Sequence, residues 1–314
     1  MEQISIKEDI AGTSAETTVD TALVESQFLP DGRQWAWNHS SLEPAKSCPR
    51  KYYYMVVEGW RPKSSSDDMT FGWHYAKALE LYHRWRSFGA SHAEALENVC
   101  FSTLADTQEW ESKHNAKTRE TLLRSIIWYL DTYENDPCET LVLPGGQPAV
   151  ELSFRFQLDP DIMLCGHLDR IVSYGGDYYV QDQKTTGATL GGYYFRRYNP
   201  NDQMSLYTIA AEVVWHQPVK GVMIDAAQIA VGFTRFERGF TFRTQAQNDK
   251  WLKDVKYWIE RTWEAEAAGW PLNDTTYIIY KSCPFREMCS KDPSVQPQYL
   301  ETLFERRPDN PLSR

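Results

Sequence analysis

The feature that most restricts the fold of this sequence is a change in the spacing of its apolar residues near position 148. Before that point, residues 69–88, 91–108 and 117–133 show the three-to-four-residue spacing of helices, and a shorter helix is predicted after Ser40 or Ser41. After it, apolar residues take every second position from Val150 to Leu158, which is typical of a half-buried strand. The chain is therefore predicted to have a helical part followed by a sheet.

The second half of the chain continues the strand pattern. Strands are predicted at 163–173 and 178–183, and Tyr174-Gly-Gly-Asp177 between them has the composition of a hairpin turn. A helix at 201–215, strands at 221–232 and 236–242 and a long helix at 245–268 follow. This order predicts an α/β fold, in which a mixed sheet is flanked by helices and preceded by a helical insertion.

The sequence also suggests a division of the chain. Residues 1–32 are polar and lack periodicity, so they are predicted to be a flexible tail. Residues 33–314 are predicted to form one domain. Within it lie a helical part at about 69–135, the main core at about 149–268 and a cysteine-containing segment at about 275–314.

Composition sets limits on partners and location. The net charge of −10 argues against a surface that is basic all over, but it allows a carboxylate-rich site with a local basic strip. The 12 Trp and 18 Tyr could fill a core or stack on bases. No apolar run approaches the ~20 residues of a membrane span, and no signal peptide is visible. A cytoplasmic protein with reduced cysteines and no membrane contact is expected.

Two carboxylates and an amine are predicted to meet on the hairpin. Asp182 and Lys184 are two residues apart, so both side chains emerge on one face of a strand, and Asp169 on the preceding strand would lie near Asp182. Hard oxygen ligands of this kind suit Mg²⁺ or Mn²⁺. The alternative is a solvated hairpin with an Asp–Lys ion pair, which is the more frequent meaning of Asp-x-Lys alone.

Two further features accompany this triplet. Gln203 and Tyr207 are spaced i, i+4 and share one face of the helix that follows the hairpin. His74 stands near the start of an earlier helix, where a neutral imidazole could be another metal ligand. Taken singly, each has an ordinary alternative, His74 as a surface or core histidine and the other two as common helix residues.

In this order, the motifs resemble those of the RecB-type nuclease domains of the PD-(D/E)xK superfamily, which include the CRISPR-associated adaptation exonucleases and many phage recombination nucleases. The resemblance covers residues 38–290. The matching motifs are Ser40-Ser-Leu42, Cys48-Pro-Arg-Lys-Tyr-Tyr53, Phe71-Gly-Trp-His74, Gly166-His-Leu-Asp-Arg-Ile171, Asp182-Gln-Lys-Thr185 and Gln203-Met-Ser-Leu-Tyr207.

The resemblance implies a restriction-endonuclease-like fold and a role for each motif. His74, Asp169, Asp182 and the Gln183 carbonyl would hold the metal, and Lys184 would be the catalytic lysine. Gln203 and Tyr207 would position the DNA or the site. The implied function is a metal-dependent deoxyribonuclease, and specifically an exonuclease on DNA with single-stranded ends, acting with recombination, repair or phage DNA-processing proteins. The alternative, which the acidic charge favours, is a non-catalytic DNA-binding or assembly subunit with the same fold.

Cysteines and arginines give two further hypotheses. Iron–sulfur members of this family use one early and three late cysteines; Cys48, Cys283 and Cys289 match three positions, and Tyr280 occupies the fourth. A 4Fe–4S cluster is one interpretation, and packing of the chain ends by three leftover thiols is the other. The segment 191–198 carries Arg196 and Arg197 among aromatics and is predicted to be a loop. It could grip single-stranded DNA, or it could be packed by its own rings.

Overall fold

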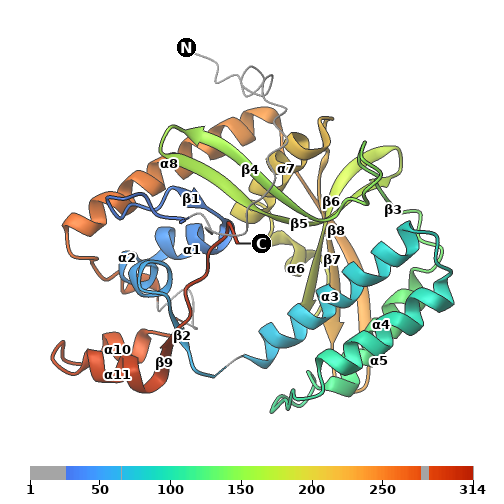
Figure 1. Cartoon of the computed structure of the whole chain (residues 1–314), viewed down its shortest axis with the longest axis horizontal. Coiled ribbons are helices and arrows are strands. Elements are labelled where there is room, and N and C mark those ends of the chain that lie inside the picture. Colours follow the sequence, from blue (N-terminus) through green and yellow to red (C-terminus); the bar gives the residue numbers. More distant parts are fainter. Residues whose placement is uncertain (1–25, 65, 277–282, 314) are drawn as a thin grey trace, which may run out of the picture.

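A computed structural model describes residues 26–64, 66–276 and 283–313 (Figure 1). At its centre is a seven-stranded sheet with the order β1-β5-β6-β7-β8, and β3 and β4 also pair with β5. Two pairings, β1 with β5 and β6 with β7, are parallel and the others are antiparallel. The predicted mixed α/β sheet is confirmed. The strands are β1 (Ala36–Trp37), β3 (Glu139–Thr140), β4 (Val150–Asp159), β5 (Ile162–Tyr174), β6 (Asp177–Thr186), β7 (Gly221–Ile229) and β8 (Thr234–Phe242).

Three of the predicted helices cover one face of the sheet. They are α3 (Asp67–Ser87), α4 (His92–Asp106) and α5 (Arg119–Thr132), each within about two residues of its predicted range. Their apolar side chains form one cluster with Ala227 and Ile229 of β7. Ser91 and Thr118 cap the N-termini of α4 and α5 by accepting hydrogen bonds from backbone amides.

The opposite face is covered by α1 (His39–Ser47), α7 (Asp202–Trp215) and α8 (Gln245–Ala267). Apolar residues of these helices share a cluster with Val222, Ile224 and Ala226 of β7. Because successive side chains of a strand point to opposite faces, the residues between them point toward α3–α5. The sheet is thus buried on both faces, which places the two faces of β6 in separate environments.

The C-terminal segment packs against an early part of the chain. β9 (Phe304–Arg306) pairs with β2 (Trp60–Pro62), and α10 (Arg286–Cys289) and α11 (Gln296–Leu303) lie beside them. The early part also contains α2 (Pro49–Tyr52) and a π-helix, η1 (Tyr53–Val57). Phe285, Met288 and Phe304 are buried in this contact. The two ends of the chain therefore support each other.

Two boundaries differ from prediction. Residues 1–25 of the predicted tail lie outside the described residues, but residues 26–32 pack on the body: Gln27 is buried and donates to the Asp309 carbonyl at 2.6 Å. The predicted loop at 191–198 contains a short helix, α6 (Gly192–Arg196), because the ring of Phe195 lies directly over Gly239 of β8. Among the helices that the structure describes, none has the length and apolar character of a membrane span.

Candidate active site

The β5–β6 hairpin ends its strand pairing at the point where the predicted carboxylates begin. Two glycines with positive φ, Gly175 and Gly176, make its turn, and pairing continues as far as Arg170 opposite Gln181. Beyond that pair the carboxylate of Asp169 takes the place of a strand partner, because its Oδ2 accepts a hydrogen bond from the backbone amide of Gln183 at 2.9 Å. Asp169 therefore stands at the point where β5 and β6 part.

Asp182 and Lys184 lie on one face of β6, as their spacing predicts. Lys184 Nζ is 2.5 Å from Asp182 Oδ2 and forms an ion pair with it. The side chain of Asp182 is only 1% exposed, and apart from the Lys184 ammonium neither of its oxygens has a hydrogen-bond donor among the described residues. A buried carboxylate in this state is costly unless a further cation compensates it.

The electrostatics of the three groups are linked. Burial, and then the charge of Asp182, raise the pKa of Asp169 to about 6, while Lys184 and the Gln183 amide oppose this rise. Burial alone would lower the pKa of Lys184, but Asp182 and Asp169 outweigh it and the net shift is upward. The lysine is therefore charged at neutral pH, and Asp169 carries a proton only below about pH 6.

Helix α7 brings the predicted glutamine and tyrosine to the same face of the sheet. Asn201 caps the helix by accepting a hydrogen bond from the Met204 amide at 3.2 Å. Gln203 Nε2 donates to the Tyr207 hydroxyl at 2.9 Å. Burial and the charges of Asp169 and Asp182 raise the pKa of Tyr207 well above its usual value, so the phenol is neutral beside the two carboxylates.

The structure does not bring His74 to this group. Gly72 faces β6, where an added Cβ would lie 3.3 Å from Thr185 Oγ1, and Ala76 lines a small cavity with Asp169. His74 is two residues from each, and at about 100° per residue it points to the other side of α3. There its ring stacks on Trp110, with centroids 5.8 Å apart. In residues 26–64, 66–276 and 283–313, no three His, Cys, Asp or Glu side chains are grouped closely enough to hold a metal ion.

Two titratable neighbours of the site were not predicted. His39, the first residue of α1, has a buried Nδ1 without a hydrogen bond, and its pKa is lowered by burial and then by Lys184. Glu80 of α3 adds negative charge near Asp169. The spacing of Gly72, Ala76 and Glu80 at i, i+4 and i+8 could have identified Glu80 as facing the sheet. Nothing local in the sequence distinguishes His39.

The candidate iron–sulfur residues lie near one another but gain no further support. Cys48 at the start of α2 is buried, and both Cys48 and Cys289 are close enough to Cys283 to affect its pKa, which burial raises. Tyr280, at the fourth position of the motif, lies outside the described residues. Cys283 and Cys289 pack in the C-terminal cluster with Tyr54 and Met55 of η1.

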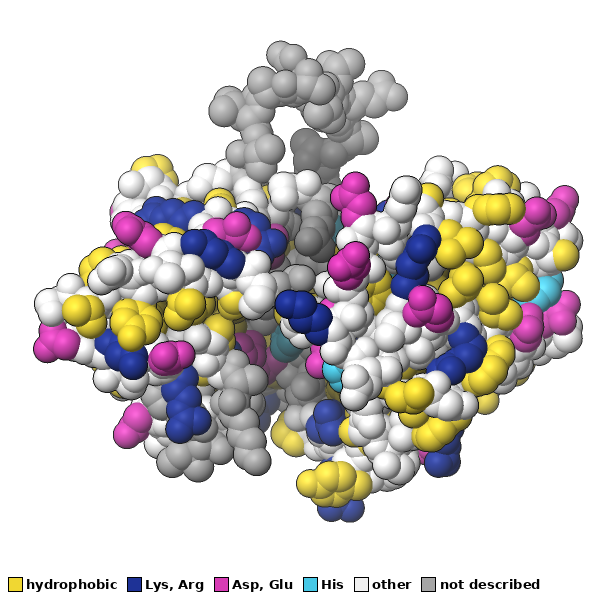
Figure 2. Space-filling view, turned by 90° about the horizontal axis from the view of Figure 1, so that it is seen from below, with side chains coloured by type: hydrophobic (Ala, Val, Ile, Leu, Met, Phe, Trp, Pro, Cys, Tyr) yellow, Lys and Arg dark blue, Asp and Glu magenta, His cyan; other side chains and the backbone are white. Residues whose placement is uncertain are grey.

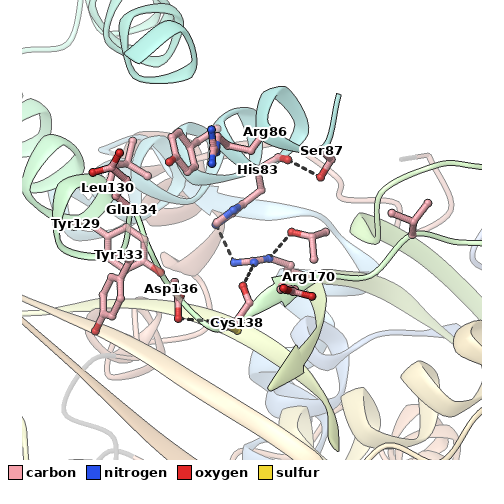
Figure 3. Close-up of a pocket in the computed structure, with 14 residues that line it drawn as sticks. His83, Arg86, Ser87, Tyr129, Leu130, Tyr133, Glu134, Asp136, Cys138 and Arg170 are labelled. Carbon is pink, nitrogen blue, oxygen red and sulfur yellow. Dashed lines mark hydrogen bonds between the residues drawn. The ribbon is translucent and has the colours of Figure 1, made fainter. Parts of the chain in front are cut away.

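A second group of buried charges lies on the other face of β6, beside a cavity of about 280 Å³ (Figure 3). Arg170 donates to Gln181 Oε1 at 2.8 Å and to the Cys138 carbonyl at 2.7 Å, and its Nη1 is 3.0 Å from His83 Nε2. Burial and the neighbouring Arg170 lower the pKa of His83 well below its usual value, so this imidazole is neutral and accepts the bond.

Asp225 of β7 completes this second group. Its Oδ2 accepts hydrogen bonds from the Tyr129 hydroxyl at 2.5 Å, Gln181 Nε2 at 2.5 Å and Arg238 Nε at 3.0 Å. Arg238 also forms an ion pair with Asp136 at 2.5 Å. These polar groups mostly bind one another, and of them Arg170, His83, Tyr129 and Asp136 line the cavity.

Comparisons with known proteins bear on the family of this chain. The model of the PD-(D/E)XK nuclease superfamily matches residues 36–290. A crystal structure of a candidate exonuclease from Eubacterium rectale is 10% identical, with a TM-score of 0.48, 82% of this chain covered and 90% of that chain covered. A crystal structure of SSO0001 is 13% identical, with a TM-score of 0.26 and coverages of 57% and 74%. No curated protein matches the chain. Because the family model spans most of its length, this chain belongs to the PD-(D/E)XK nuclease superfamily.

Proposed function

We propose that this protein is a metal-dependent DNA nuclease that hydrolyses phosphodiester bonds at the Asp169–Asp182–Lys184 group. The observation that carries the proposal is the carboxylate of Asp182, which is buried next to a second carboxylate and has the Lys184 ammonium as its one partner among the described residues. Structural carboxylates at this depth are normally supplied with donors. A chain of this superfamily with such a group has the charge and the acceptors that a divalent cation requires.

The residues fit Mg²⁺ or Mn²⁺. Asp182 Oδ1 has no partner among the described residues, Asp169 has one oxygen not bonded to Gln183, and the Gln183 carbonyl is a further candidate ligand. When bound, the ion would lower the pKa of a water and stabilise charge on the phosphate. His74 has no part in this proposal, because its ring faces Trp110.

The protein's own groups supply orientation and charge. Lys184, held charged between two carboxylates, would offset negative charge that develops on the phosphate. The hydrogen bond from Gln203 fixes the Tyr207 hydroxyl, which leaves its proton free to donate toward the carboxylates or a substrate oxygen. Packing of α7 over β6 limits the access of bulk water.

The finer assignment is an exonuclease that acts on DNA with single-stranded ends, in recombination, repair or phage DNA processing. It is supported by the resemblance to nucleases with those activities and by the α3–α5 layer, which lies beside the end of β6 and could restrict entry to chain ends. A non-catalytic DNA-binding subunit is the competing function.

The exonuclease assignment and the competing DNA-binding function can be tested by digestion of linear and circular DNA, each in single- and double-stranded form. With Mg²⁺ or Mn²⁺ the wild type should degrade linear DNA, and EDTA or Lys184→Ala should abolish this. Lys220→Ala is the matched control, since Lys220 is ion-paired with Asp177 at the far end of the strands. Equal activity of wild type and Lys184→Ala would overturn the proposal. Cleavage of circles would remove the exonuclease assignment, and DNA binding without cleavage would favour the non-catalytic subunit.

A further inference from the structure

Helix α6 begins eight residues after Lys184 and is fixed to the body by side chains on one side only. Tyr194 is buried, and its hydroxyl is 3.1 Å from that of Tyr198. The ring of Phe195 covers Gly239, where an added Cβ would lie 2.2 Å from the ring. Arg197 lies over the Tyr194 ring at 4.5 Å and donates to the Tyr194 carbonyl at 3.1 Å. These contacts hold a helix of five residues in one position.

The two remaining side chains of this helix have no partner. Tyr193 is 86% exposed, the highest value among the exposed large hydrophobic side chains of the described chain. Neither its ring nor its hydroxyl contacts another side chain in residues 26–64, 66–276 or 283–313, and the Arg196 guanidinium forms no ion pair there. Residues three apart lie on the same face of a helix, so a free aromatic ring and a free cation stand side by side.

Helix α6 lies on the same face of the sheet as Asp182. Phe195 packs on Gly239 of β8, Gly239 pairs with Ile224 of β7, and Ile224 pairs with Asp182. The Tyr194 phenol is close enough to Lys184 to contribute to its raised pKa. A substrate strand that leaves the catalytic group over α6 would meet the exposed side of this helix, which carries Tyr193 and Arg196.

We infer that Tyr193 stacks on an unpaired base of the substrate strand while Arg196 binds the adjoining phosphate, so that α6 selects single-stranded DNA. The inference rests on the proposed nuclease function. A tyrosine ring can stack on a base only where the base is not already stacked within a duplex. The protein carries a net charge of −10, and Figure 2 shows acidic and basic side chains interspersed rather than a continuous basic surface. Affinity must therefore come from local contacts of this type.

Fluorescence of 2-aminopurine, placed near either end of a single-stranded oligonucleotide, tests the inference in a full-length Lys184→Ala background that leaves the DNA intact. Stacking on Tyr193 should quench the fluorescence. Tyr193→Ala should remove the quenching and weaken single-strand binding by about 5- to 150-fold, the range for loss of one stacked base. Tyr193→Phe should restore both, because the ring and not the hydroxyl is required. Affinity for blunt duplex DNA should change less than about twofold.

Tyr257→Ala is the matched control. Tyr257 is also exposed, at 51%, but it lies on α8 and its ring already contacts Trp258 and Arg261. The Tyr257→Ala variant should quench 2-aminopurine and bind single-stranded DNA as strongly as the unsubstituted background protein. Unchanged quenching and affinity in Tyr193→Ala would overturn the inference while leaving the nuclease proposal intact, as would an equal loss of duplex binding. If the wild type binds no DNA in any form, the proposed function itself fails.

Discussion

The two faces of the sheet carry buried charge in different states. Toward α3–α5, Asp225 Oδ2 accepts three hydrogen bonds, and Arg238 joins it to Asp136. Toward α7, Asp182 has one partner among the described residues, the Lys184 ammonium, which is also the candidate catalytic group. The first group is largely closed because its members bind one another, although Asp225 Oδ1 has no partner among the described residues. The second is open, which costs stability and leaves acceptors for a cation and substrate.

The largest expected effect is on activity at the open group. Lys184→Ala should lower the rate of DNA cleavage by on the order of 10²–10³-fold, since it removes the cation that faces the developing charge. The free energy of unfolding should also fall, because Asp182 loses its one cationic partner. Initial rates on linear DNA with saturating Mg²⁺, at a temperature where circular dichroism shows both proteins folded, measure the effect on cleavage. A rate within about tenfold of wild type in the folded variant would mean that Lys184 belongs to a structural group like that of Asp225.

The next largest effect is on stability at the closed group. Asp225→Ala removes the acceptor of three donors and should lower the free energy of unfolding by about 3–5 kcal/mol. Asp177→Ala, at an exposed ion pair with Lys220, should cost no more than about 1 kcal/mol. Urea unfolding of both variants provides the measurement. Equal losses would remove the distinction between closed and exposed charge.

Asp169→Asn is expected to have a smaller effect on the free energy of unfolding, and to raise it rather than lower it. The pKa of Asp169 is raised to about 6 from its ordinary 3.8. Between pH 3.8 and pH 6, the folded protein therefore binds a proton that the unfolded chain releases. Wild-type stability should therefore decrease as pH rises through this window, and the asparagine variant should lack this decrease. At pH 7 without divalent ions the variant should be more stable by at most about 3 kcal/mol. Parallel stability curves from pH 4 to 7 would contradict this.

The same titration predicts how divalent ions bind. A cation requires the ionised carboxylate, so stabilisation of the fold by Mn²⁺ should fade as pH drops through about 6. Melting curves with Mn²⁺ and with EDTA, at pH 5 and pH 7.5, give the comparison, and Lys220→Ala serves as the control protein. A Mn²⁺ shift of the same size at both pH values would remove Asp169 from the ligands.

The smallest effect is expected for Tyr207→Phe. It removes one hydrogen bond from Gln203 and should cost about 0.5–1.5 kcal/mol of stability. If the hydroxyl only braces the helix, the cleavage rate should follow this modest loss. A fall in rate at unchanged stability would instead place the hydroxyl against the substrate.

The features predicted correctly from the sequence depend on local spacing. The two-residue turn fixes the pairing of β5 with β6, which brings Asp169, Asp182 and Lys184 together. The i, i+4 rule does the same for Gln203 and Tyr207.

The features that were missed depend on contacts between distant segments. The rotation of α3, which turns His74 away, is set by burial of Phe71, Tyr75 and Leu79 against α4, α5 and β7. The helical form of α6 depends on Gly239, a residue far along the chain in β8. Neither the periodicity of α3 nor the composition of 191–198 contains that information, because tertiary packing decides between locally similar alternatives.

The tight turn at Gly175–Gly176 has a consequence for how the chain can vary. A strand that slips by one residue transfers every side chain to the opposite face of its sheet. A one-residue slip of β6 would therefore send Asp182 and Lys184 toward α3–α5 and present Gln181 and Gln183 to α7. Variants of this hairpin that keep their chemistry should consequently keep Arg170 opposite Gln181, whatever the length of the turn.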